Sequence, residues 1–193
     1  MTQRSRNART PFSRRAVLGA GASLLAGSLA AKAAPRPGFD GLYQEPWFLP
    51  TSTNLTTDFA ETTKAKKNFA IVWEMRRCPW CARLHLENFA RDRLVSYLRD
   101  NFNLVQLNIQ APREITDFDG EKLSEEALSY RYGIRSTPTI QFFAPSDAAK
   151  GREVGRIGYV ESAEMLTLLR FIRERGYENG SFEDWVRTHK NPA

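Results

Sequence analysis

The sequence predicts an α/β fold with a mixed central sheet of about four to five strands and helices on both faces. Residues 69–75 (FAIVWEM) are an apolar run, typical of a strand that is buried on both faces. A helical pattern over residues 78–102 and a strand at 103–109 follow, and this βαβ order requires a parallel pair with a right-handed crossover. Two further strands, at 139–143 and 153–157, are separated by a short turn and therefore predict an antiparallel pair.

The first half of the chain adds three features to this core. Residues 34–57 contain four prolines and little periodicity, so we expect an extended lead-in with a short strand near 42–48. Residues 58–67 predict a helix with a polar face, which opens the main domain. The long helical segment at 78–102 is expected to break near residues 91–92.

The second half alternates polar loops with helices. Residues 110–122 are polar and predict a surface loop, which is an insertion or a partner surface. The other expected elements are a helix at 123–132 that ends at Gly133, a turn at 145–151, an amphipathic helix at 162–175 and a last helical piece at 182–189. The main domain is therefore assigned to residues 58–176 and a C-terminal tail to 177–193.

Composition and charge exclude several classes of protein. The chain has 193 residues, of which 41% are hydrophobic, so a packed core is expected. Two cysteines are too few for a disulfide-rich scaffold or a four-cysteine metal site. The net charge is +6, but residues 1–33 hold six basic and no acidic residues, and the remainder has 22 of each sign. The main domain therefore gives no reason to expect binding to nucleic acid or to an anionic membrane.

Residues 1–33 have the organisation of an export signal. A basic region ends at Arg14-Arg15, residues 16–31 carry no charge, and Ala31-Lys32-Ala33 supplies small residues for a signal peptidase. The sequence around Arg14-Arg15 resembles a twin-arginine signal. The apolar block is short for a membrane span, although an uncleaved N-terminal anchor is the alternative. We expect cleavage after Ala33 and a mature protein in the periplasm, with membrane contact only during export.

The most specific motif is Cys78-Pro79-Trp80-Cys81, directly after the strand at 69–75. A cysteine at a helix N-terminus faces unpaired backbone N–H groups, so we expect the pKa of the Cys78 thiol to fall below its free value of about 8.5. Pro79 suits the first helical turn because its missing N–H has no partner there. The spacing lets Cys81 reach Cys78 and close a disulfide, which favours redox activity.

The residues around the two cysteines allow two interpretations each. Arg76 and Arg77 lower the thiol pKa further, or they are solvated and only add charge. Trp80 shapes a contact surface for a partner, or it packs on the loop after Gly133. We favour the partner role for Trp80.

Metal binding and a purely structural disulfide compete with the redox interpretation. His85 completes a Cys-x-x-Cys-x-x-x-His pattern, but His189 is the only other histidine and no fourth zinc ligand is evident. A lone histidine at this position is more often a surface or boundary residue. Ala82 stands where covalent haem attachment needs a histidine. A disulfide that closes so small a loop stabilises little. No metal and no cofactor are therefore expected.

A proline before the strand at 139–143 carries a resemblance to a known family. By itself Thr137-Pro138 favours a trans bond at the start of a strand. Its position 57 residues after Cys81, however, resembles the cis-proline loop beside the Cys-x-x-Cys of thioredoxin-fold proteins. With the strand at 69–75 and the segment 132–139 (YGIRSTPT), the chain resembles the thioredoxin superfamily over residues 58–175.

Within this superfamily the sequence is most similar to the SoxW-type periplasmic thioredoxins. Leu84-His85, Leu107-Asn108-Ile109 and residues 113–120 (REITDFDG) carry this likeness. It implies a reducing role, with electrons from a CcdA- or SoxV-like membrane carrier. The implied substrates are disulfide-containing periplasmic proteins, such as those of sulfur oxidation or cytochrome maturation.

The resemblance also implies a role for each residue of the site. Cys78 is expected to be the exposed nucleophile and Cys81 the buried resolving thiol. Pro138 is expected to be cis, with Thr137 presenting its backbone to an extended substrate. Val72 stands where thioredoxins carry a buried aspartate for proton transfer, so either Glu74 or water takes that role.

Two alternative functions remain open at this point. A Dsb-like oxidase uses the same residues, because the direction of electron flow depends on potential and partners. A thioredoxin-fold binding or chaperone module would not need its cysteines at all.

Overall fold

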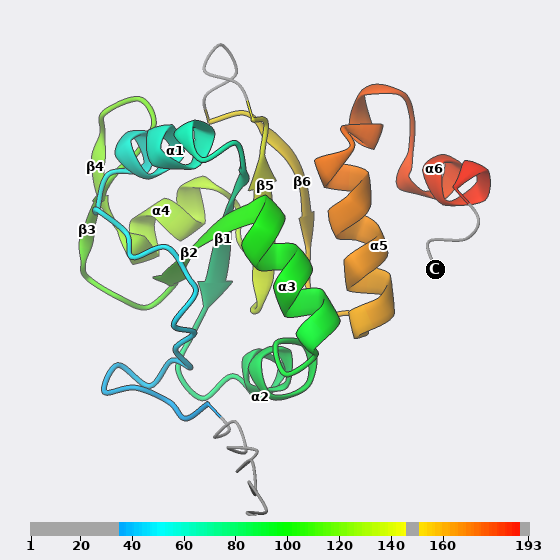
Figure 1. Ribbon diagram of the computed structural model, residues 1–193. Coiled ribbons are helices and arrows are strands. Elements are labelled where there is room, and N and C mark those ends of the chain that lie inside the picture. Colours follow the sequence, from blue (N-terminus) through cyan, green and yellow to red (C-terminus); the bar gives the residue numbers. More distant parts are fainter. Residues whose placement is uncertain (1–34, 146–150, 190–193) are drawn as a thin grey trace, which may run out of the picture. The chain divides into compact units, whose positions relative to one another are not determined.

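A four-stranded sheet with the strand order β2-β1-β5-β6 forms the centre of the fold (Figure 1). The computed structural model describes residues 35–145 and 151–189, so the predicted export signal and most of the predicted turn lie outside the described residues. The strands are β1 (Asn68–Glu74), β2 (Phe102–Asn108), β5 (Thr139–Phe143) and β6 (Glu153–Ile157). β1 and β2 run parallel, whereas β5 is antiparallel to β1 and β6. The predicted mixed sheet is therefore confirmed.

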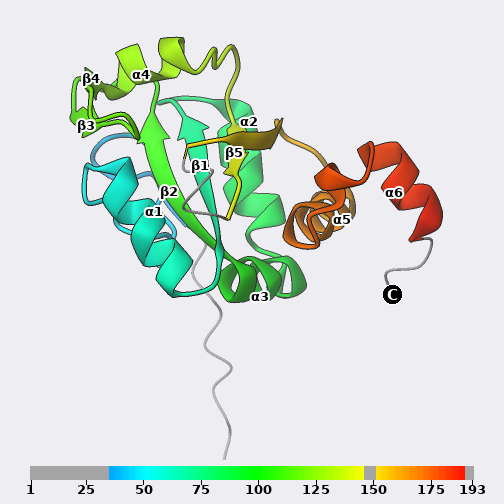
Figure 2. The same ribbon diagram turned by 90° about the horizontal axis from the view of Figure 1, so that it is seen from above.

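Helices cover both faces of this sheet (Figure 2). They are α1 (Leu55–Lys64), α2 (Pro79–Arg83), α3 (Asp92–Asn101), α4 (Glu125–Arg131) and α5 (Ser162–Arg173), and a last helix, α6 (Phe182–Thr188), packs on α5. Alternate residues of β1 point to opposite faces. Ala70 and Val72 pack with apolar residues of α3 and α5, whereas Ile71 and Trp73 pack with those of α1 and α4. β1 is thus buried on both sides, and the loop that follows it starts from a fixed position.

The helical segment after β1 is interrupted near residues 91–92, as predicted. α2 continues into a π-helical turn, η1 (Leu84–Asn88), and Arg91 then has extended backbone angles before α3 begins. Single π-helical turns occur often at functional sites. This one carries His85.

The N-terminal lead-in differs from the prediction. Residues 42–48, all described, form no strand, and the lead-in instead makes the isolated bridge Pro37–Tyr43. Further along, the Leu49 N–H donates to the Leu104 oxygen of β2 at 2.9 Å. Pro46 and Pro50 lack the N–H that a continuous ladder needs, which explains why no strand forms.

One helix boundary and one expected loop also differ from the prediction. α1 begins at Leu55, earlier than predicted, because the Asn54 side chain accepts the Thr57 N–H and caps the helix. The expected loop at 110–122 contains β3 (Glu114–Thr116), which pairs with β4 (Lys122–Ser124). Ile115 of β3 is fully buried in the core with α1 and α4, so this segment is part of the packed fold.

The C-terminal tail packs against α5. A 3₁₀ turn, η3 (Gly176–Glu178), leads to α6, and the Trp185 ring lies 5.8 Å from that of Phe171. Among the described residues, none of the helices combines the length and apolarity that a membrane crossing would need.

Candidate active site

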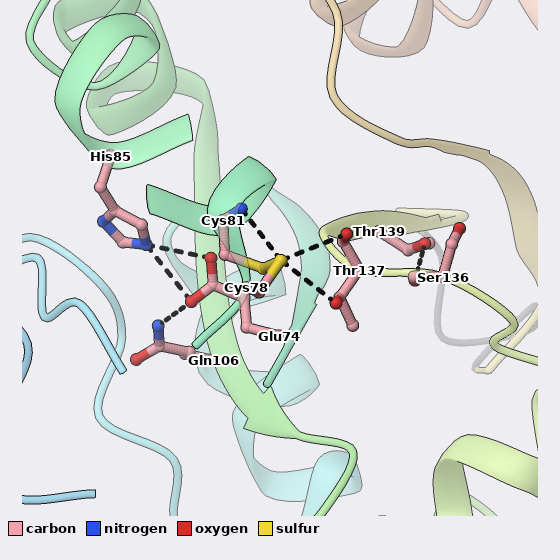
Figure 3. The surroundings of a disulfide bond; sticks show 8 residues. All are labelled: Glu74, Cys78, Cys81, His85, Gln106, Ser136, Thr137 and Thr139. Carbon is pink, nitrogen blue, oxygen red and sulfur yellow. Dashed lines mark hydrogen bonds and ion pairs between the residues drawn. A yellow bond between two sulfur atoms is a disulfide. The ribbon is translucent and has the colours of Figure 1, made fainter. Parts of the chain in front are cut away.

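The two cysteines lie where β1 ends and α2 begins (Figure 3). Cys78 is the N-cap residue of α2, and its Sγ accepts the Cys81 N–H at 3.1 Å. Pro79 occupies the first helical turn, as predicted. The two residues form a disulfide with their Cα atoms 5.2 Å apart. An N–H aimed at Cys78 Sγ stabilises a thiolate there once the disulfide is reduced.

The expectation that Cys78 is the exposed member of the pair is wrong. Cys78 is 6% exposed and Cys81 is 3% exposed, so both are buried. The cause is the loop before β5, since both the backbone oxygen and the Oγ1 of Thr137 lie 3.4 Å from Cys78 Sγ. In the disulfide the sulfur has no hydrogen, so the Thr137 hydroxyl is the donor of this pair. A cavity that both cysteines line gives access to the sulfurs.

The Thr137–Pro138 peptide bond is cis, as the resemblance implied. The loop is held by a hydrogen bond in which Thr139 Oγ1 donates to the Ser136 oxygen at 2.8 Å. Thr137 and Pro138 line a cavity of about 520 Å³ together with Trp80 and Tyr159. This cavity lies beside the loop whose Thr137 contacts Cys78 Sγ.

Trp80 is 50% exposed. Its ring lies 5.1 Å from that of Tyr159, and the Arg83 guanidinium lies 4.9 Å and 4.8 Å from the two ring centres. Arg83 in turn makes a bidentate pair with Glu87 at 2.8 Å. The position of Trp80 leaves half of an aromatic surface open beside Pro138.

The same cluster shifts two pKa values. The Arg83 hydrogen bond, aided by that of the Tyr159 hydroxyl at 2.7 Å, lowers the pKa of Glu87 to about 2. Burial, followed by the hydrogen bond to Glu87, raises the pKa of Tyr159 to about 12. Glu87 is therefore ionised and Tyr159 neutral at any ordinary pH, which fixes the charges that surround Trp80.

A second cavity, of about 370 Å³, borders the disulfide itself. It is lined by Cys78, Cys81, Glu74 and Arg77, along with residues of the lead-in. Arg77 is exposed and has a left-handed backbone with φ 59°. Val72 and Glu74 lie on the same face of β1, so the Glu74 carboxylate is on the side of α2.

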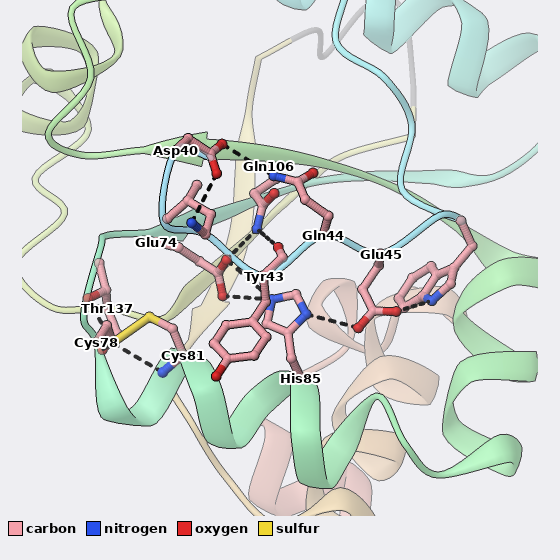
Figure 4. A network of polar contacts seen from close by, with 12 residues as sticks. Asp40, Tyr43, Gln44, Glu45, Glu74, Cys78, Cys81, His85, Gln106 and Thr137 are labelled. Carbon is pink, nitrogen blue, oxygen red and sulfur yellow. Dashed lines mark hydrogen bonds and ion pairs between the residues drawn. A yellow bond between two sulfur atoms is a disulfide. The ribbon is translucent and has the colours of Figure 1, made fainter. Parts of the chain in front are cut away.

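Glu74 and His85 form a buried ion pair, which corrects the expectation that His85 is a surface residue. Both are 0% exposed, and His85 Nε2 lies 3.1 Å from Glu74 Oε1. The other ring nitrogen, Nδ1, lies 2.9 Å from Glu45 Oε1 (Figure 4). Gln106 Nε2 also donates to Glu74. The lead-in thus supplies a partner, Glu45, that no motif in the sequence pointed to.

The charges on either side raise the pKa of His85. Burial alone would lower this pKa, but hydrogen bonds to Glu45 and Glu74, with their negative charges, outweigh burial and bring it above 6.5. Tyr43 stacks on the ring at a centroid distance of 5.4 Å. The two neighbouring glutamates therefore favour the protonated form of His85.

Neither histidine is placed to complete a metal site with the cysteines. Both nitrogens of His85 face carboxylates, and His189 stacks on Trp185 at 4.3 Å. Among the described residues, no group of three or more His, Cys, Asp or Glu side chains is arranged to hold a metal ion.

A cysteine pair at the start of the helical segment of a parallel βαβ unit, opposite a cis-proline, defines a thioredoxin fold. The chain belongs to the thioredoxin-like domain family, whose model matches residues 55–173. Its fold and its paired cysteines support thiol–disulfide oxidoreductase chemistry.

Two solved structures illustrate the likeness. A thioredoxin-fold protein from Helicobacter pylori is 26% identical, with a TM-score of 0.53 over 64% of this chain and 80% of that one. A thioredoxin from Thermus thermophilus is 22% identical, with a TM-score of 0.52 over 72% of this chain and 94% of that one. No curated protein matches the sequence.

Proposed function

We propose that this protein is a periplasmic thiol–disulfide reductase that acts on protein disulfides. The observation that carries the proposal is the Cys78–Cys81 disulfide at the start of α2, with Thr137 and the cis-Pro138 against Cys78 Sγ. In the reduced protein, the Cys81 N–H and the Thr137 hydroxyl both face Cys78 Sγ. Both donors favour a thiolate at this sulfur.

The reaction transfers two electrons in two exchanges. The Cys78 thiolate attacks one sulfur of the substrate disulfide, forms a mixed disulfide and releases the other substrate sulfur as a thiolate. Cys81 then loses its proton and attacks Cys78 Sγ, which closes the Cys78–Cys81 bond and releases the second substrate thiolate. Water protonates the released thiolates. Glu74 is the proton acceptor for Cys81, because both line the same cavity.

The substrate binds at the cavity that Trp80, Thr137 and Pro138 line. Thr137 and Pro138 present backbone to an extended segment next to the substrate cystine, which gives affinity with little demand on sequence. Trp80, half exposed beside them, supplies apolar contact area to the same segment. Pro79 fixes the start of α2, and Arg77 adds positive charge at the mouth of the other cavity.

The finer assignment rests on sequence likeness. The SoxW-type pattern supports sulfur-oxidation or cytochrome-maturation proteins as substrates, and a CcdA- or SoxV-like carrier as the electron donor. The twin-arginine pattern in residues 1–33 supports export and cleavage near Ala33. A Dsb-like oxidase is the second candidate, and a non-redox binding or chaperone module is the third.

The direction of electron flow is tested by the equilibrium potential of the Cys78–Cys81 pair against glutathione. A reductase requires a potential near that of thioredoxin, about −270 mV, whereas a DsbA-like oxidant lies near about −120 mV. We expect a value at the reducing end. A potential close to the oxidising value would replace the reductase assignment with the oxidase.

Export is tested separately in the full chain. We expect the wild-type protein in the periplasmic fraction, shortened near Ala33, and the double variant Arg14→Lys, Arg15→Lys retained at full length in the cytoplasm. Fractionation with mass spectrometry of the N-terminus measures both. Periplasmic, processed protein from the double variant would refute the twin-arginine route, and unprocessed wild-type protein would refute cleavage.

A further inference from the structure

Two buried charged residues have no part in the exchange described so far. His85 is fully buried, and the side chain of Glu45 is 7% exposed. Buried ion pairs contribute little net stability, because removing charges from water costs about as much as their attraction returns. Apolar residues of similar size would serve packing as well. Their presence directly behind the active site therefore points to a role in its chemistry.

Glu74, His85 and Glu45 form a continuous row. His85 Nε2 faces Glu74 at 3.1 Å, and His85 Nδ1 faces Glu45 at 2.9 Å. The ring is fixed by stacking against Tyr43 and by the edge of Phe89, whose centroid lies 5.1 Å away. Glu74 and Glu45 are the charged groups in contact with the ring, and Tyr43 is the other titratable group beside it (Figure 4).

The two ends of this row open into different cavities. Glu74 lines the cavity of about 370 Å³ that holds both cysteines. Glu45 lines another cavity, of about 560 Å³, between the lead-in and β2. His85 lines neither of them and is shielded from solvent. The row is thus a polar connection between the reacting thiol and a second, separate opening.

Both ends are also held in place by neutral donors. Gln106 Nε2 donates to Glu74 and to the Tyr43 oxygen, the latter at 2.8 Å. Trp47 Nε1 donates to Glu45 Oε2 at 3.0 Å. Neither donor changes its charge near neutral pH, so a proton that enters the row stays on its three ionisable members until it leaves.

We propose that His85 and Glu45 are positioning residues that release a proton to solvent each time Glu74 takes one from Cys81. This deepens the proposed function and rests on it. The resting row has two carboxylates and one imidazolium, a net charge of −1. When the S–H bond of Cys81 breaks, its proton goes to Glu74, and His85 loses its Nδ1 proton through Glu45 to water.

The exchange leaves the buried charge unchanged. Glu74 is then neutral, His85 is neutral and Glu45 is negative, so the net charge of the row is still −1. On re-reduction the steps reverse, because Glu74 returns its proton to Cys81 and His85 regains one from solvent through Glu45. A constant buried charge avoids the cost of adding or removing a charge in a region of low dielectric constant.

The test separates the two exchanges with a chromogenic aromatic disulfide, dithiobis(nitrobenzoate). Attack by Cys78 on the reagent releases a first nitrothiobenzoate, and attack by Cys81 on the resulting mixed disulfide releases a second. Stopped-flow absorbance resolves the two phases in the full-length, reduced protein. The variants are His85→Gln and Glu45→Gln, and His189→Gln, at the C-cap of α6, is the control for loss of a histidine elsewhere.

We expect the second phase to slow about 10–100-fold in His85→Gln and in Glu45→Gln, with the first phase within about twofold of wild type. The defect is expected to be largest below pH 7 and to shrink as the pH rises, because hydroxide then removes the Cys81 proton directly. His189→Gln is expected to match wild type in both phases.

Second phases within twofold of wild type from pH 5.5 to 8 in both variants would overturn the proposal. If His85→Gln does not fold by circular dichroism, Glu45→Gln decides, since it keeps the size and hydrogen bonding of the side chain. A missing first phase in the wild-type protein would instead refute the proposed function itself, so the two failures are distinguishable.

Discussion

Replacing Cys78 by serine is expected to abolish reduction of insulin disulfides, with a rate loss of at least about 10³-fold to the uncatalysed background. A serine hydroxyl at this position is not ionised at neutral pH and cannot form the mixed disulfide. Cys81→Ser is expected to remove turnover as well, but for another reason. It leaves Cys78 able to attack once, and the mixed disulfide then persists because no second thiol resolves it.

The two variants therefore differ in what they accumulate. Insulin turbidity measures turnover, and mass spectrometry under non-reducing conditions measures the adduct. We expect an adduct with Cys81→Ser and none with Cys78→Ser. An adduct with Cys78→Ser and none with Cys81→Ser would reverse the assigned order of attack, and full turnover by Cys78→Ser would remove this cysteine from the mechanism.

Replacing Glu74 by alanine is expected to destabilise the fold by about 3–5 kcal/mol, because it removes one partner of a buried ion pair. Glu74 and His85 are both fully buried, and the change removes the carboxylate that faces His85 Nε2. For a protein of this size the loss corresponds to a fall in Tm of about 6–20 °C. Glu114→Ala is the matched control, since Glu114 pairs with Lys122 on the surface, and its loss is expected to cost less than about 1 kcal/mol.

The destabilisation by Glu74→Ala also depends on pH. The pKa of His85 is raised in the folded protein, so its charge contributes stability that is fully present below about pH 6.5. That contribution is lost as the pH rises through the raised folded value. We therefore expect the gap between wild type and Glu74→Ala, measured by urea unfolding, to be larger at pH 5.5 than at pH 9. A gap that grows with pH would contradict the charge state assigned to His85.

The central strands and the motif could be predicted because their signals are local. The apolar run at 69–75 corresponds to β1, and the βαβ order predicts its parallel pairing with β2. The position of Cys78 at a helix start follows from the strand before it and from Pro79 after it. These features depend on neighbouring residues, which a single sequence displays.

The lead-in and the buried charges could not be predicted in this way. Glu45 meets His85 across 40 positions of sequence, and no spacing rule joins a proline-rich segment to a helix so far along the chain. His85 is buried because the lead-in covers it. Its position on a helix alone therefore predicted a surface residue, which is wrong. The burial of Cys78 also depends on a distant segment, since Thr137 of the loop before β5 contacts it from 59 positions away.

Prediction from sequence also failed for the polar segment 110–122. Residues 110–122 have the composition of a surface loop, yet β3 forms within them because Ile115 fills the core beside α1 and α4. One apolar side chain among polar neighbours is too weak a signal to predict a strand of three residues.

The central claim, that Cys78 exchanges disulfides with other proteins, is tested most directly by trapping in the cells that make the protein. The full chain is expressed as Cys81→Ser and, as the control, as the double variant Cys78→Ser, Cys81→Ser, and acid-quenched extracts are run on non-reducing gels. The account predicts periplasmic adducts of Cys81→Ser that disappear with dithiothreitol and are missing from the double variant. No adduct with Cys81→Ser, or the same adducts with both variants, would contradict it.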